Sequence, residues 1–174
     1  MVSIEDLKLP PHNLDAERGV LSGILIDNAV MDICDNVSLE VKDFYAKEHQ
    51  MIFDAMMSLK NSYKTIDIVT VADELAKKDF LDIIWWTNYL YDLSTFLLSI
   101  SWCGEYCQIV KEKSILRRVL SVCQQMIGDV YDQEDTLTIM DQLEKKIFDL
   151  TQTNISNKLI HIKEILWERV EKYM

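Results

Sequence analysis

Residues 99–131 read SISWCGEYCQIVKEKSILRRVLSVCQQMIGDVY. This stretch contains no proline and only two glycines, Gly104 and Gly128, so nothing in it forces the chain out of a helix. Its apolar residues recur along one helical face, and they are Ile109, Leu116, Val119, Leu120, Cys123 and Ile127. We therefore predict one long helix, about 45 Å in length at about 1.5 Å per residue.

A second helix is predicted after a short polar turn at residues 132–135. Its apolar residues follow near-heptad spacing, and they are Leu137, Met140, Leu143, Ile147 and Leu150. Two helices joined by a short turn form an αα-hairpin. Because an isolated hairpin cannot bury both of its faces, we expect this apolar row to pack against a second copy of the chain.

Shorter helical segments precede the hairpin. Asn13 and Asp67 are placed to cap two of them, and Asp15 and Glu17 lie in the first turn after Asn13. The apolar stripe of that first helix consists of Leu14, Leu21, Ile24 and Leu25. Gly19 and Gly23 are four residues apart on the same helix, a spacing that we interpret as close packing of two helices.

The chain is thus predicted to be all-α, with a compact multi-helix head, a long αα-hairpin and a terminal linker helix. The predicted division is residues 1–12 as an extended N-terminal arm, 13–98 as the helical head, 99–150 as the dimerising hairpin and 151–174 as the linker and linker helix. The last helix is amphipathic, with Ile162, Ile165, Leu166 and Val170 on one side. That side docks either on the body of this chain or on another subunit or domain.

Composition excludes several classes of function. Of the 174 residues, 18 are Lys or Arg and 29 are Asp or Glu, so the formal net charge is −11. An acidic chain repels nucleic-acid phosphates, so we expect little direct DNA binding. The one basic cluster, which consists of Lys111, Lys113, Arg117 and Arg118, is interpreted as a solvated face. No apolar run reaches the about 20 residues of a membrane span, and we expect a cytoplasmic protein.

No enzyme site is predicted. The phosphate-binding pattern G-x-x-x-x-G-K-[S/T] and the dinucleotide pattern G-x-G are both missing from the sequence. His12, His49 and His161 lie in unrelated segments, and His49 is interpreted as a surface or capping residue. Cys103 and Cys107 share a helical face but have no further ligand nearby, so we interpret them as packing thiols. We therefore expect no catalytic, cofactor-binding or metal-binding residue.

Several blocks of sequence together resemble one protein family. Residues 10–21 read PPHNLDAERGVL, similar to that family's P-P-x-x-[IL]-[ED]-A-E-x-x-V-L. Residues 43–53, 66–70 and 109–117 are similar to its D-F-Y-x-x-x-H-x-x-I-F, I-D-x-V-T and I-V-x-E-K-x-x-L-R. With the spacing between blocks kept, the chain resembles the N-terminal domain, with linker helix, of DnaB-type replicative DNA helicases.

The resemblance implies a function that composition could not show. It implies an N-terminal scaffold tier that supports ring assembly and recruits primase during DNA replication in the bacterial cytoplasm. The implied partners are a second copy in a dimer, a hexamer built as a trimer of dimers, the C-terminal domain of primase, a helicase loader and, through the linker helix, a neighbouring ATPase domain. The parent would be an ATP-dependent 5'-3' DNA helicase whose motor, with ATP and Mg, lies beyond this chain. The alternative is a stand-alone helical adaptor that acts as a helicase loader or inhibitor.

By position, the resemblance makes Asp15, Tyr89, Leu120 and Met126 candidates for primase binding. Each also has an ordinary structural explanation: Asp15 complements a helix dipole, Tyr89 packs in the core, and the other two pack in the core or in a dimer. Trp85-Trp86 replaces two glycines of the family pattern, and Trp102 follows a segment that lacks the family's proline. Neighbours on a helix point about 100° apart, so we expect either Trp85 or Trp86 to be buried and the other exposed.

Overall fold

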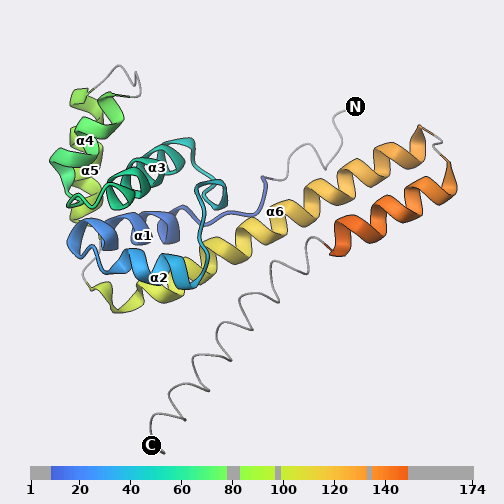
Figure 1. The fold of residues 1–174 in the computed structure, drawn as a ribbon, viewed down its shortest axis with the longest axis horizontal. Helices are drawn as coiled ribbons and strands as arrows, with labels where there is room; N and C mark the ends of the chain where they lie inside the picture. Colours follow the sequence, from blue (N-terminus) through green and yellow to red (C-terminus); the bar gives the residue numbers. More distant parts are fainter. Residues whose placement is uncertain (1–8, 78–82, 97–98, 133–134, 149–174) are drawn as a thin grey trace, which may run out of the picture. The chain divides into compact units, whose positions relative to one another are not determined.

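The computed structural model describes residues 9–77, 83–96, 99–132 and 135–148, and the side chains of residues 83–85 are not described. Every regular element in these ranges is helical, which confirms the predicted all-α class (Figure 1). The elements are α1 (Leu14–Ile26), α2 (Val30–Asn36), η2 (Val41–Asp43), α3 (Lys47–Asn61), α4 (Ile68–Ala76), α5 (Ile83–Ser94), η3 (Ile100–Trp102), α6 (Cys103–Tyr131) and a further helix at residues 136–148.

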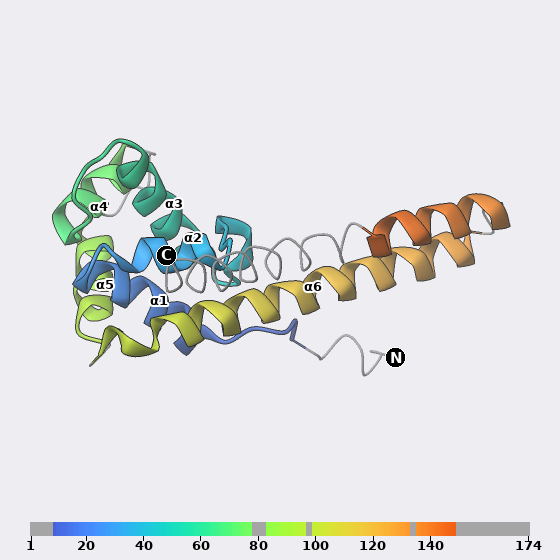
Figure 2. The same cartoon turned by 60° about the horizontal axis from the view of Figure 1, so that its bottom comes forward.

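The chain divides into two compact units, Met1–Ser114 and Ile115–Met174. In the first unit, which we call the head unit, α1 contacts α2, α3 and α5, while α4 contacts α3 and α5. The boundary lies within α6. The head unit therefore includes the first turns of a helix that we predicted to belong to the hairpin. In the second unit, the rest of α6 runs beside the helix of residues 136–148 (Figures 1 and 2).

Two predicted helix caps are present in the head unit. The side chain of Asn13 accepts a hydrogen bond from the backbone N–H of Ala16 at 3.0 Å. Asp67 and Thr70 form a reciprocal pair, in which each side chain accepts from the other's backbone N–H at 2.8 and 2.9 Å. Each cap satisfies N–H groups that a helix start otherwise leaves without partners.

The long helix begins later than expected. Ser99 caps the short 3-10 helix η3, accepting from the backbone N–H of Ser101 at 3.3 Å, and α6 itself starts at Cys103.

The apolar stripe of α1 also differs at one residue. Leu14 is exposed, whereas Leu21 and Ile24 of the same predicted stripe are fully buried. Leu14 is the first residue of α1, at the edge of the packed face.

Gly19 and Gly23 allow α1 to lie directly against the start of α6. A Cβ atom on Gly19 would come within 2.5 Å of Cδ2 of Tyr106, and one on Gly23 within 2.3 Å of Sγ of Cys103. Both distances are far below van der Waals contact, so a Cβ at either position would force the facing side chain to move. The predicted close packing of two helices is therefore confirmed.

Three buried cysteines fill the space around this contact. Sγ of Cys34 lies 3.7 Å from Sγ of Cys107, and neither thiol is oxidised. The hydrogen bond with Cys107 and burial raise the pKa of Cys34, and burial raises the pKa of Cys103 to about 11. The thiols of Cys34 and Cys103 are therefore neutral, and the buried cysteines pack as small apolar groups. Among the described residues, no three Cys, His, Asp or Glu side chains gather as a metal would require.

A buried ion pair ties the segment between α2 and α3 to α6. Nζ of Lys111 lies 2.7 Å from Oδ2 of Asp43 and donates to the carbonyl of Ser38 at 2.5 Å. The Ser114 hydroxyl donates to the other carboxylate oxygen of Asp43, also at 2.5 Å. Interpreting Lys111 as part of a solvated basic face was therefore wrong. Lys111 lies one turn beyond Cys107 on the face of α6 that packs into the head unit, and Asp43 compensates its buried charge.

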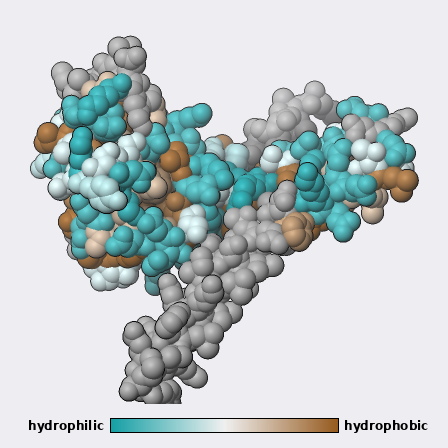
Figure 3. Space-filling model, viewed as in Figure 1, coloured by the Kyte–Doolittle hydropathy of each residue, from teal (hydrophilic) through white to brown (hydrophobic). Residues whose placement is uncertain are grey.

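The second unit leaves many apolar side chains exposed. Leu137 is 75% exposed, and Met140, Ile147, Leu116, Leu120 and Ile127 are also exposed. Hydrophobic surface is visible on this unit among hydrophilic side chains (Figure 3). Nζ of Lys146 lies 3.7 Å from both Sδ of Met126 and Oδ2 of Asp129, and these contacts join the two helices. None of the helices in the described ranges combines the length and apolar character that crossing a membrane requires.

The tryptophans that depart from the family pattern are only partly described. Trp86 is buried at 7% exposure, and Trp102 is exposed. The side chain of Trp85 lies outside the described residues, so the expectation that one of the pair is exposed stays a prediction.

We predict that Gly23→Ala lowers the free energy of unfolding by about 1–3 kcal/mol, because the new methyl group overpacks a filled contact. Gly104→Ala is the matched control: its Cβ would meet only Cγ2 of Ile33, at 3.8 Å. The control should be neutral or stabilising by up to about 1 kcal/mol, from helix propensity. Urea unfolding followed by circular dichroism measures both variants. Equal stability of the Gly23→Ala variant and the wild type would contradict the close packing of α1 on α6.

Candidate functional site

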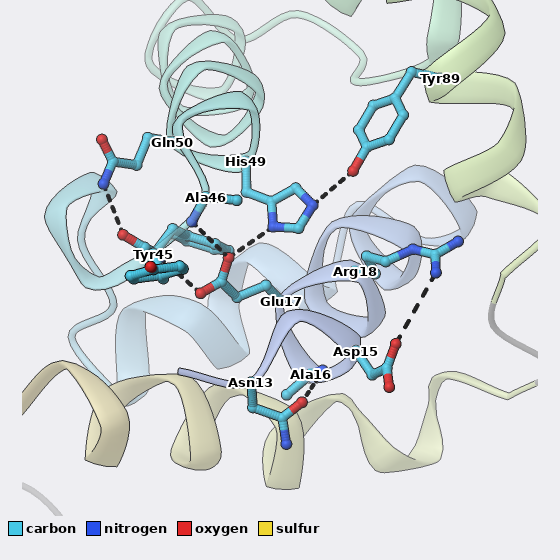
Figure 4. A network of polar contacts seen from close by, with 11 residues as sticks. Asn13, Asp15, Ala16, Glu17, Arg18, Tyr45, Ala46, His49, Gln50 and Tyr89 are labelled. Carbon is cyan, nitrogen blue, oxygen red and sulfur yellow. Dashed lines mark hydrogen bonds and ion pairs between the residues drawn. The ribbon is translucent and has the colours of Figure 1, made fainter. Parts of the chain in front are cut away.

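Glu17 is the centre of a polar cluster at which α1, α3 and α5 meet. It is only 1% exposed although it lies in the first turn of α1. Its carboxylate accepts three hydrogen bonds: from the backbone N–H of Tyr45 at 2.7 Å, from that of Ala46 at 3.2 Å, and from Nδ1 of His49 at 2.7 Å (Figure 4). Burial of a carboxylate is tolerated only when such partners replace water.

The two backbone N–H groups that donate to Glu17 lie at the start of α3. Tyr45 and Ala46 immediately precede α3, and Ala46 is its N-cap residue without a side chain that could cap. The carboxylate from α1 holds this turn in place, so the start of α3 is fixed by a residue 29 positions earlier. The ring of Tyr45 also stacks on that of His12, with centroids 4.3 Å apart, which attaches the N-terminal arm to the same turn.

His49, on α3, connects Glu17 to Tyr89 on α5. It is 2% exposed, and its Nε2 lies 2.7 Å from the hydroxyl oxygen of Tyr89. Interpreting His49 as a surface or capping residue was therefore wrong. A usable signal was present in the sequence, because His49 lies three and four residues before the buried Ile52 and Phe53, on the apolar face of its helix.

Tyr89 is the member of the cluster that reaches the surface. It is half-buried on α5, and its hydroxyl points inward to His49. Burial raises the pKa of Tyr89; Arg18 opposes this rise, whereas the carboxylates of Glu48 and Glu17 add to it. The hydroxyl is therefore protonated at neutral pH and able to donate.

Arg18 contacts Asp15 and the ring of Phe96. Its guanidinium lies 4.2 Å from the ring centroid of Phe96 and 4.0 Å from Oδ1 of Asp15, whose side chain is 84% exposed. Two of the candidate primase-binding residues thus lie on helices that pack against each other, Asp15 on α1 and Tyr89 on α5 (Figure 4). Neither Glu17 nor His49 was among the residues singled out from the sequence as functional.

The remaining candidate residues belong to the second unit or lie outside the described residues. Leu120 is exposed, whereas Met126 is 9% exposed and packs beside Lys146. In the candidate dimerisation row, Leu137, Met140 and Ile147 are exposed and Leu143 is half-buried. Leu150 and the linker-helix residues Ile162, Ile165, Leu166 and Val170 are outside the described residues.

We predict that Glu17→Ala lowers the free energy of unfolding of the chain by about 3 kcal/mol or more. The substitution leaves two backbone N–H groups and one imidazole N–H buried without acceptors, each at a cost of about 1–3 kcal/mol. Glu48→Ala, at an exposed position of α3, is the control and should change stability by about 0.5 kcal/mol or less. Thermal and urea unfolding give the difference, and similar stability of the two variants would show that the Glu17 cluster is dispensable.

Comparison with known proteins places the chain in one family. The model of the DnaB-like helicase N terminal domain matches residues 9–112. Replicative DNA helicase DnaC of Bacillus subtilis (strain 168) is 32% identical over 167 residues, covering 95% of this chain and 37% of that protein. Replicative DNA helicase DnaB of Geobacillus stearothermophilus is 32% identical over 160 residues, covering 91% of this chain and 35% of that protein. The chain therefore spans less than two fifths of the length of these relatives.

Solved structures agree with the sequence matches. The N-terminal domain of DnaB helicase from Mycobacterium tuberculosis is 30% identical, with a TM-score of 0.75 over 81% of this chain and 99% of that chain. A DnaB-like replicative helicase, described with its interactions with primase, shares the fold at 23% identity and a TM-score of 0.66, over 79% of this chain and 31% of that chain. The family match, the covering relatives and the shared helical fold together show that this chain belongs to the DnaB-like helicase N-terminal domain family.

Proposed function

We propose that the chain is the N-terminal interaction tier of a bacterial replicative DNA helicase, which supports ring assembly and recruits primase in the cytoplasm. The observation that carries this proposal is that exposed Asp15 and half-buried Tyr89 lie on two packed helices, α1 and α5, of a head unit that belongs to the DnaB-like family. A carboxylate and an aromatic ring on neighbouring helices suit a partner that offers both a cationic side chain and an apolar one.

The partner class follows from the family. The DnaB-like neighbour is described with its interactions with primase, and the C-terminal domain of primase is our proposed ligand for the surface of Asp15 and Tyr89. Direct DNA binding is not part of the proposed function of this chain. The formal net charge is −11, and Lys111 is committed to Asp43 in the interior of the head unit.

Self-association is the second part of the proposal. The second unit exposes Leu137, Met140 and Ile147 to solvent, and an apolar row of this kind usually marks a contact surface. Pairing of two hairpins would cover the row, and three such pairs would build a hexamer. ATP and Mg belong to the helicase motor domain, on which the linker helix would dock; a helicase loader is a further proposed partner.

We predict that Asp15→Lys and Tyr89→Ala each weaken binding of the C-terminal domain of a bacterial primase. Charge reversal replaces attraction by repulsion. Loss of an aromatic anchor costs about 2 kcal/mol, which is about 30-fold in affinity. Asp73→Lys on α4 and Tyr63→Ala after α3 are matched controls, because they make the same changes at other exposed positions. Isothermal titration calorimetry gives the affinities, and a loss equal to that of the controls would contradict the docking surface.

We predict that Leu137→Asp or Met140→Asp shifts the chain towards monomers. Covering each such side chain contributes about 1.5–3 kcal/mol, so the dimer should weaken by at least about tenfold. Lys145→Asp places the same carboxylate at an exposed polar position of the same helix and should leave association unchanged. Sedimentation equilibrium over a range of concentrations distinguishes the variants. Identical mass distributions for wild type and both apolar variants would exclude this row as the self-association surface.

A further inference from the structure

Glu17, His49 and Tyr89 form a chain of hydrogen bonds from the interior of the head unit to its surface. The three residues come from α1, α3 and α5, and the two bonds that join them are both 2.7 Å long. Glu17 and His49 are buried, whereas Tyr89 is half-buried, so only the last member can meet a partner (Figure 4). By contrast, both side chains of the Asp43–Lys111 ion pair are buried.

The chemistry of the three groups determines which group donates in each of these two hydrogen bonds. An ionised carboxylate can only accept, so the proton on the Glu17 side of the imidazole must be on Nδ1. In its neutral form the imidazole has a single N–H, and its Nε2 is then an acceptor. In that form the hydroxyl of Tyr89 donates to Nε2, and its proton is directed into the head unit.

A tyrosine whose hydroxyl is anchored in this way keeps one orientation before any partner arrives. Without the bond, the ring of a half-buried tyrosine has more side-chain freedom. A partner would then have to restrict that freedom, which lowers affinity by the cost of immobilising the side chain. The backbone donors of Tyr45 and Ala46 hold the Glu17 carboxylate itself in place, so the orientation is set from the interior.

We infer that Glu17 and His49 are positioning residues for Tyr89, which they hold in the orientation that the primase domain binds. This inference rests on the proposed function, because it assumes that Tyr89 is part of the docking surface. Glu17 acts by fixing the tautomer of His49, and His49 acts by accepting the hydroxyl proton of Tyr89. The partner contacts the ring of Tyr89, and neither buried residue touches the partner.

The tautomer of His49 is the first test, and it does not depend on primase. NMR of the full chain, with its histidines labelled with nitrogen-15, should show His49 protonated on Nδ1 at pH 8. Tyr89→Phe should leave the proton on Nδ1, since the carboxylate sets it. Glu17→Gln should abolish this preference, since an amide offers both a donor and an acceptor. An Nε2-protonated His49 in the wild-type chain would overturn the inference.

Binding of the C-terminal domain of primase is the second test, and it uses a double-mutant cycle. Tyr89→Phe keeps the ring but removes the hydroxyl. His49→Asn keeps an N–H for Glu17, but its shorter side chain has no acceptor at the position of Nε2 that bonds Tyr89. We expect each variant to lose about 2- to 12-fold in affinity, the equivalent of one immobilised side chain. The double variant should lose no more than either single variant, because both remove the same bond. Thr70→Ala, which removes the hydrogen bond from the backbone N–H of Asp67 to Oγ1 of Thr70 in the cap of α4, is the control for destabilisation of the head unit alone and should bind as wild type.

The outcomes separate this inference from the proposed function. If Asp15→Lys and Tyr89→Ala bind primase as the wild type does, the docking surface is wrong, and the positioning role falls with it even if His49 is protonated on Nδ1. If those two variants lose affinity but Tyr89→Phe binds as the wild type, only the positioning role is overturned. Additive losses in the double variant would also overturn it, and Tyr89→Phe decides the question if His49→Asn does not fold.

Discussion

The close approach of α1 to the start of α6 is the constraint on which the head unit depends. Gly19 and Gly23 leave no Cβ between the two helices, and Tyr106 and Cys103 occupy the space that a larger residue would need. Because α1 is fixed in this position, its next turn towards the N-terminus brings Glu17 against the start of α3. The same face of α6 carries Lys111 to Asp43, so one packed contact aligns both buried polar clusters.

These clusters define the arrangement of the helices more than they add stability. Two buried charged groups rarely stabilise a fold more than apolar residues of the same size would, because desolvation offsets their attraction. They do penalise every arrangement that separates them, since each member would then be buried without a partner. Glu17 therefore selects one placement of α3 against α1, and Asp43 selects one path for the segment between α2 and α3. The surface around Asp15 and Tyr89 is built on this fixed arrangement.

The sequence predicted the features that depend on local rules. The all-α class, the caps at Asn13 and Asp67, and the glycine contact follow from spacing and from the chemistry of helix ends. The sequence did not reveal that His49 and Lys111 are buried, because their partners, Glu17 and Asp43, are distant in the chain and come close only when the helices pack. The start of α6 was placed too early, because no proline or glycine separates residues 99–102 from the helix, although they form a 3-10 turn. Asp15 and Tyr89 became candidates through family resemblance alone, and the structure adds that they lie on two helices, α1 and α5, that pack against each other.

The central claim is that the surface around Asp15 and Tyr89 receives the C-terminal domain of primase. The most direct measurement is a titration of the nitrogen-15-labelled chain with the unlabelled primase domain, followed by two-dimensional NMR. We expect the largest chemical-shift changes on the first turns of α1 and on α5 around Tyr89. Saturable binding whose shift changes leave α1 and α5 untouched would contradict this claim.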